Sequence, residues 1–187
     1  MTAVTDHRTR LLAGMAAAVR EKGFAATTLA DVVRHAGVSR RTFYEHFTDP
    51  VDCYLTLIEE VGERMLAAVA DAMHADAPLA ERVDRAVGVY LDLFAADPEV
   101  SRSYWTEAHV TGDRGREVTR RMSRRTGDVL YALAAEAGHG DVPEDFGIFV
   151  AAGVRELALL AHDAGRPMSD ARAASVALVQ RLLRVDP

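Results

Sequence analysis

Side chains that can form hydrogen bonds with nucleic acid lie close together in one short stretch of the chain. Arg41, Thr42 and Tyr44 carry donors and, at helical spacing, lie on one side with Glu45, whereas Phe43 points the opposite way. Guanidinium, hydroxyl and phenol groups bind DNA noncovalently at phosphate oxygens and base edges. The pattern predicts a short helix that keeps an apolar side on the protein and offers a polar side to the DNA major groove.

A preceding helix has to hold this short helix in place. Thr27 or Thr28 can cap its start, and Gly37 can end it in the left-handed conformation. Ser39 can then cap the second helix, which is predicted to run to Phe47. Two short helices joined by a glycine turn are typical of a helix-turn-helix. The apolar positions of the first helix recur at helical spacing, at Leu29, Val32, Val33 and Ala36.

Apolar periodicity, prolines and glycines predict further helices along the chain, and no stretch alternates as a strand does. We therefore predict an all-α fold of about nine helices, with a three-helix helix-turn-helix domain at residues 1–50 and a helical bundle for ligand binding and dimerisation at residues 51–187. The fourth predicted helix, at 50–74, is long enough to bridge the two. The other helices are predicted at 7–22, 79–96, 98–110, 113–137, 143–164 and 168–185.

Charge is distributed unevenly along the chain. Residues 1–50 hold seven lysines and arginines against five acidic residues, a net charge of +2, although the whole chain carries −6. The N-terminal part is therefore mildly basic, and the rest repels phosphate. We expect modest non-specific affinity for DNA, which dimerisation would increase by doubling the contacts.

The chain shows features of a protein of the cytoplasm. The single cysteine, Cys53, cannot form an internal disulfide and is expected to be buried. The polar first ten residues do not read as a signal peptide, and no apolar run approaches 18 residues. We predict a cytoplasmic location without a membrane partner.

Residues 8–57 resemble the N-terminal domain of TetR-type bacterial transcriptional regulators. The resemblance rests on three motifs that occur in the family's order: Thr27-Thr28, Ala36-Gly37-Val38-Ser39 and Thr42-Phe43-Tyr44-Glu45-His46-Phe47. It implies a homodimer whose two recognition helices read half-sites of double-stranded operator DNA in consecutive major grooves. It also implies a ligand cavity and a dimer interface in the C-terminal helices.

Position by position, the resemblance assigns DNA contacts to two segments. Thr28 corresponds to a phosphate contact at a helix N-terminus, and Arg41 is our candidate for a base edge because a guanidinium can donate two bonds to guanine. Alternatively, Arg41 forms only a surface ion pair with Glu45, worth about 0.2–0.5 kcal/mol. The full set of predicted DNA-binding residues is Thr28, Ser39, Arg40, Arg41, Thr42, Tyr44 and His46.

The chain departs from the family at the start of the long helix. A lysine that meets a phosphate is usual there, and this chain has Pro50. If that contact is kept, the helix N-terminus itself would have to bind the phosphate.

Aromatic and sulfur-containing side chains mark a candidate pocket for a small-molecule effector. The same residue types at helical spacing also serve as core filler, and that alternative stays open. The cluster of Tyr104, Trp105 and His109 ranks first. The candidate residues are Tyr90, Phe94, Tyr104, Trp105, His109, Met122, Phe146 and Phe149.

The last two predicted helices are candidates for a four-helix dimer interface across a two-fold axis. Small residues there permit close approach of helices, although the two helices could instead only close the core of one subunit. The candidate interface residues are Phe149, Ala152, Leu157, Leu160, Leu178 and Leu182.

Catalysis has little support in the sequence. A di-iron bundle needs Glu-x-x-His on two helices, and the one instance, Glu136 to His139, is interrupted by Gly138. No catalytic residue, cofactor or metal is predicted. We predict a repressor released from its operator by a small molecule. The alternatives are a ligand-independent regulator or activator of the same fold, a helical-bundle enzyme, or a protein-interaction module that does not bind DNA.

Overall fold

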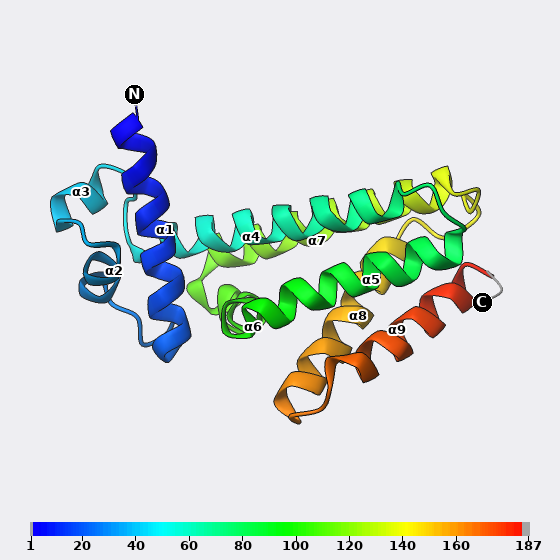
Figure 1. Ribbon diagram of the computed structural model, residues 1–187. Helices are drawn as coiled ribbons and strands as arrows, with labels where there is room; N and C mark the ends of the chain where they lie inside the picture. The colour runs from blue at the N-terminus through cyan, green and yellow to red at the C-terminus, as the bar shows by residue number, and fades with distance from the viewer. Residues whose placement is uncertain (1, 185–187) are drawn as a thin grey trace. The chain divides into compact units, whose positions relative to one another are not determined.

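The computed structural model describes residues 2–184, with side chains for 7–108 and 111–184. Over these residues the chain forms nine α-helices and one 3₁₀ turn without a strand (Figure 1), which confirms the predicted all-α fold. The elements are α1 (Thr2–Lys22), α2 (Leu29–Ala36), α3 (Arg40–Tyr44), α4 (Pro50–Met73), α5 (Leu79–Ala96), α6 (Pro98–Glu107), η1 (Ala108–Thr111), α7 (Asp113–Glu136), α8 (Phe146–Asp163) and α9 (Met168–Leu182).

Several predicted helix boundaries were wrong by about a turn. α1 begins at Thr2 rather than residue 7, α6 ends at Glu107 rather than residue 110, and α9 ends at Leu182 rather than residue 185. α3 ends at Tyr44 rather than Phe47, because the amides of His46 and Phe47 both bond to the carbonyl of Phe43 and close a turn there. Phe47 is nevertheless buried next to Phe43, with 5.7 Å between ring centroids, as its predicted inward position requires. α8 begins at Phe146 rather than Pro143, since residues 143–145 form a turn.

The helices divide into two compact units. The helix-turn-helix unit comprises the chain up to Val61 together with Glu99–Thr119, and the helical body comprises Gly62–Pro98 and the chain from Arg120 onward. α4 and α7 each contribute to both units. The division predicted at residue 50 concerns function and stays a prediction, whereas packing adds α6 and the start of α7 to the N-terminal unit.

Close backbone contact between α1 and α2 organises the helix-turn-helix unit. A Cβ at Gly14 would lie 2.7 Å from the carbonyl oxygen of Val32, so only glycine allows this approach. Arg10 reaches from α1 to the end of α2, where its guanidinium donates to the carbonyls of Ala36 (3.0 Å) and Gly37 (2.7 Å). Apolar side chains from α1 to α4 fill the core, among them Leu11, Met15, Val19, Val32, Phe43, Cys53 and Ile58.

The helical body packs α9 against both α5 and α8. Phe94 of α5 is fully buried in its core, and its ring meets that of His162 edge-on. Two glycines let α7 and α8 touch, because a Cβ at Gly147 would lie 2.1 Å from the carbonyl oxygen of Gly127. No helix within residues 2–184 has the length and apolar character to cross a membrane.

Candidate nucleic-acid interface

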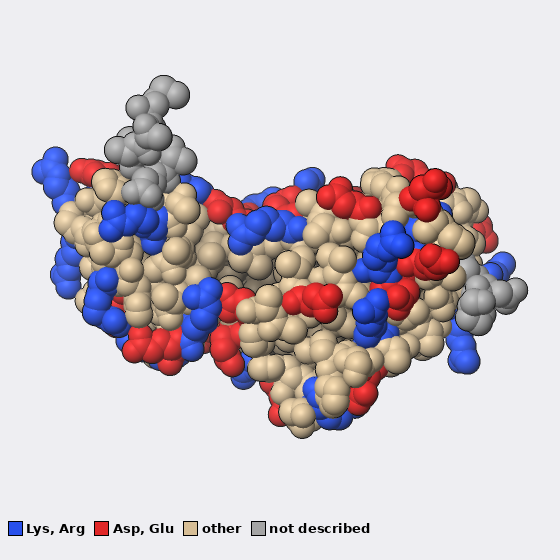
Figure 2. All heavy atoms as spheres, in the orientation of Figure 1, with Lys and Arg blue, Asp and Glu red and all other residues tan. Residues whose placement is uncertain are grey.

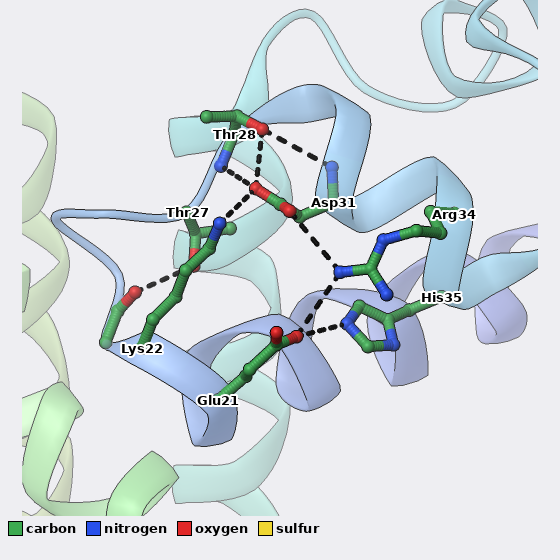
Figure 3. Close-up of polar contacts among 8 residues, drawn as sticks. Glu21, Lys22, Thr27, Thr28, Asp31, Arg34 and His35 are labelled. Atoms are coloured by element: carbon green, nitrogen blue, oxygen red, sulfur yellow. Dashed lines mark hydrogen bonds and ion pairs between the residues drawn. The ribbon is translucent and has the colours of Figure 1, made fainter.

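The first turn of α2 is held by a reciprocal capping box (Figure 3). The Thr28 hydroxyl accepts a bond from the amide of Asp31, and the Asp31 carboxylate accepts from the Thr28 amide at 2.9 Å. Thr28 was predicted as a cap, whereas the role of Asp31 was missed, although Thr-x-x-Asp is a recognisable capping pattern. The amides of Leu29 and Ala30 have no partner among the described residues, so they are the groups that a phosphate could meet.

Basic side chains surround this capping carboxylate. The Lys22 ammonium lies 2.6 Å from Asp31, and the Arg34 guanidinium bonds to both Asp31 and Glu21. The Lys22 ammonium, the Thr28 hydroxyl and amide, and Arg34 together hold the pKa of Asp31 well below its usual range. His35 and Arg34 likewise lower the pKa of Glu21. Figure 3 shows how these side chains join the end of α1 to α2.

The sign of this shift predicts an acid dependence of folding. Because the Asp31 carboxylate has a lower pKa when folded, its stabilising contribution is fully present above pH about 4 and is lost as pH falls toward the folded pKa. In Asp31→Asn, we expect the free energy of unfolding, from urea titrations at several pH values, to fall less steeply with acid than in the wild type. Asp71→Asn, an exposed site on α4, is the control. Equal slopes in the wild type and Asp31→Asn would contradict this role.

The turn between α2 and α3 has the predicted geometry. Gly37 has φ 62°, ψ 39°, and its amide bonds back to the carbonyls of Val33 and Arg34. Ser39 caps α3 by accepting the amide of Thr42 at 3.0 Å, and the two hydroxyls also share a hydrogen bond of 2.9 Å. The hydroxyls of Ser39 and Thr42, both predicted to contact DNA, therefore take part in the cap. This cap sets the orientation of α3.

The outward face of α3 offers three exposed donors. The side chain of Arg41 is 91% exposed and its Nε donates to Glu45 at 3.2 Å, so the alternative ion pair does form in this structure. Arg40 is exposed and makes no hydrogen bond or ion pair with any described residue, and Tyr44 is 59% exposed. Figure 2 shows basic side chains along the edge of the molecule that α2 and α3 form, with acidic side chains below them. Such an exposed basic surface suits phosphate and base contacts.

His46 and the start of α4 at Pro50 lack the exposed donors that α3 offers. The half-buried His46 ring lies edge-on to the ring of His7 in α1, 6.4 Å between centroids. At the start of α4, the amide of Asp52 donates to the Asp49 carboxylate at 2.8 Å, and Arg114 pairs with that carboxylate. The carboxylates of Asp49 and Asp52 both lie at the N-terminus of α4, where they repel phosphate. The structure thus does not support the expectation that this N-terminus replaces the missing lysine contact.

The predicted pocket residues are divided between the two units. Tyr104 is buried in the helix-turn-helix unit, and its ring lies at a tilt of 33° to that of Trp105, whereas the side chain of His109 lies outside the described residues. In the body, Tyr90, Phe94, Met122 and Phe146 are buried or half-buried, and Phe149 is 66% exposed. None of them lines an open groove of about 480 Å³ between α5 and α9, whose walls are Ala80, Glu81, Asp84, Arg85, Arg172, Val176 and Gln180.

The predicted interface residues gather on the two last helices. Phe149, Leu160, Leu178 and Leu182 are 66, 50, 54 and 45% exposed, which is unusual for side chains of this size. Ala152 and Leu157 are half-buried, and Leu157 also packs on the core of its own subunit. α8 and α9 therefore carry an apolar surface of the kind that marks a protein contact.

Comparison with known proteins identifies the helix-turn-helix. Residues 11–50, which hold most of α1, the whole of α2 and α3, and the turns between them, match the sequence model of "Bacterial regulatory proteins, tetR family". The N-terminal domain is a TetR-type domain. A TetR-type fold also extends over the rest of the chain. A TetR-family regulator of Syntrophomonas wolfei superimposes with a TM-score of 0.79 at 17% identity, covering 96% of this chain and 95% of the other.

Two further proteins similar to this chain have named roles. The regulator FadR of Bacillus subtilis, solved with stearoyl-CoA, superimposes with a TM-score of 0.69 at 17% identity over 94% of this chain and 95% of that one. The transcriptional activator FasR of Mycolicibacterium smegmatis is 23% identical over 106 residues, 57% of this chain. That match spans about half of the FasR chain.

Proposed function

We propose that this protein is a dimeric transcriptional regulator that binds operator DNA by a sequence-specific contact of α3 and is released by a small molecule. The observation that carries the proposal is the face of α3, where Arg40, Arg41 and Tyr44 are exposed on a helix capped at a fixed angle to α2. Selection of duplexes from a random pool by the wild-type protein would test it. Enrichment of a two-fold symmetric sequence is expected, and a pool without enrichment would contradict sequence-specific binding.

The apolar surface of α8 and α9 supports the dimer. Two copies that join through Phe149, Leu160 and Leu178 would bury side chains that are half or more exposed in one subunit. A dimer presents two copies of α3, which a symmetric operator needs. We further propose that the regulator acts as a repressor and that it works in the cytoplasm. The similarity to FasR, an activator, favours activation as the second candidate, and a reporter gene behind the selected duplex would separate the two.

The effector is proposed to bind in the helical body and to favour a state whose spacing of recognition helices does not fit the operator. Stearoyl-CoA is the first probe to test, because the FadR structure contains it. Fluorescence anisotropy of the selected duplex would fall on its addition if a long-chain acyl thioester is the effector. An unchanged anisotropy would exclude stearoyl-CoA as the effector.

Arg41 separates base recognition from phosphate binding. We expect Arg41→Ala to lose about 1–3 kcal/mol of specific binding and to relax the preference at one base position in each half-site. The measurement is the affinity for the selected duplex and for duplexes altered at single positions. Tyr44→Phe is the comparison, since loss of a phosphate contact weakens all sequences alike. Uniform weakening by Arg41→Ala would show that Arg41 contacts only the backbone.

A further inference from the structure

The last residue of α6 makes an unusual contact with the turn between α1 and α2. The carboxylate of Glu107 accepts hydrogen bonds from the amides of Phe24, at 3.0 Å, and Ala25, at 3.2 Å. These two amides lie beyond the end of α1, more than 80 residues away in sequence. The approach needs Gly23, whose φ is +76° and where a Cβ would lie 3.2 Å from the same carboxylate. One side chain therefore satisfies two backbone donors of this turn.

Buried polar groups hold the Glu107 carboxylate in position. The Ser103 hydroxyl donates its one hydrogen to it at 2.5 Å. The Tyr54 hydroxyl of α4 is therefore the donor toward Ser103, and its hydrogen is shared between the Ser103 carbonyl at 2.9 Å and the Ser103 hydroxyl at 2.8 Å. The Phe24 ring stacks on the Tyr54 ring, with 3.9 Å between centroids. A closed set of contacts thus joins α4, α6 and the turn, and satisfied networks of this kind are rigid.

The same residue stands where the chain changes its helical form. α6 ends at Glu107 and continues as the 3₁₀ turn η1. The start of α7 packs closely against that turn, because a Cβ at Gly115 would lie 1.9 Å from the carbonyl oxygen of Ala108. A shift of α7 or α6 would therefore move the Glu107 carboxylate relative to the two amides.

We propose that Glu107 is the positioning residue through which the end of α6 sets the α1–α2 turn, and with it the angle at which α2 and α3 meet DNA. The part that concerns DNA rests on the proposed function. Glu107 acts through the two amides that it binds, and its side chain does not have to contact DNA. Loss of the contact frees the turn, and the capped pair α2 and α3 is then held by fewer contacts.

Hydrogen exchange on the full chain tests the contact directly. Glu107→Gln keeps the shape of the side chain, but its NH₂ group would face one of the two backbone donors, so at least one bond is lost. We expect the amides of Phe24 and Ala25 to exchange at least tenfold faster by NMR. Affinity for the duplex selected by the wild type is expected to fall at least fivefold, with the same preferred sequence. Glu99→Gln, an exposed acid on the first turn of α6, should change neither quantity.

Each outcome bears on one part of the proposal. Unchanged exchange at Phe24 and Ala25 would overturn the contact, and faster exchange with unchanged DNA affinity would overturn its effect on recognition. If the wild type selects no duplex, the proposed function fails, while the exchange rates still decide whether Glu107 holds the turn. If Glu107→Gln does not fold, Ser103→Ala removes only the supporting hydroxyl and should accelerate the same two amides.

Discussion

Gly14→Ala is expected to destabilise the protein and abolish high-affinity DNA binding, although alanine is the better helix former. The new Cβ would lie 2.7 Å from the Val32 carbonyl oxygen and 2.8 Å from the Ala36 amide nitrogen. Both are backbone atoms, so α2 has to move as a whole. Overpacking of this kind costs about 1–3 kcal/mol after relaxation. This exceeds the roughly 1 kcal/mol gained from helix propensity.

The effect on DNA binding follows from the connection between α2 and α3. The connection between α2 and α3 is short and is fixed by the left-handed Gly37 and the Ser39 cap. Displacement of α2 therefore also displaces the recognition helix. The measurements are urea unfolding and affinity for the selected duplex, at a temperature where the variant is folded. Ala13→Leu, which adds volume at an exposed neighbour on α1, is the control and should be close to wild type. A Gly14→Ala protein as stable as the wild type would refute the close α1–α2 packing.

Leu178→Glu is expected to convert the proposed dimer into monomers. Leu178 is 54% exposed in one subunit, so the substitution should leave the fold intact, whereas a charge within an apolar interface is costly. We expect the dissociation constant of the dimer to rise at least a hundredfold, equivalent to about 2.8 kcal/mol. Sedimentation velocity over a range of protein concentrations would measure it. Affinity for a two-fold symmetric duplex should fall in parallel, because a monomer reads only one half-site.

A matched substitution distinguishes the interface from a general effect of charge. Ala173→Glu puts the same acid at an exposed position on a different side of α9. It should leave both sedimentation and DNA affinity unchanged. If Leu178→Glu sediments as the wild type does, the dimer uses another surface. If both variants dissociate the dimer, net charge rather than the α8–α9 surface explains the result.

Local signals explain why the helices could be predicted so fully. Thr28, Gly37 and Ser39 act within one or two turns of their own position, through caps and a left-handed residue. Prolines and apolar periodicity located the later helices in the same way. The error at the end of α3 also has a local origin, because a turn after Tyr44 keeps Phe47 on the predicted inner side without continuing the helix.

The sequence alone determined the all-α fold, the capped helix-turn-helix and the residues that lie on the exposed face of α3, since these depend on neighbours along the chain. Tertiary structure alone decided the contacts between distant residues. Arg10 caps α2 across 27 positions, and Glu107 holds amides 82 and 83 positions away. No periodicity links such pairs. Tertiary structure also decided that Arg114 pairs with Asp49, 65 positions away at the start of α4, because the partner of a charge depends on which side chains folding brings within reach.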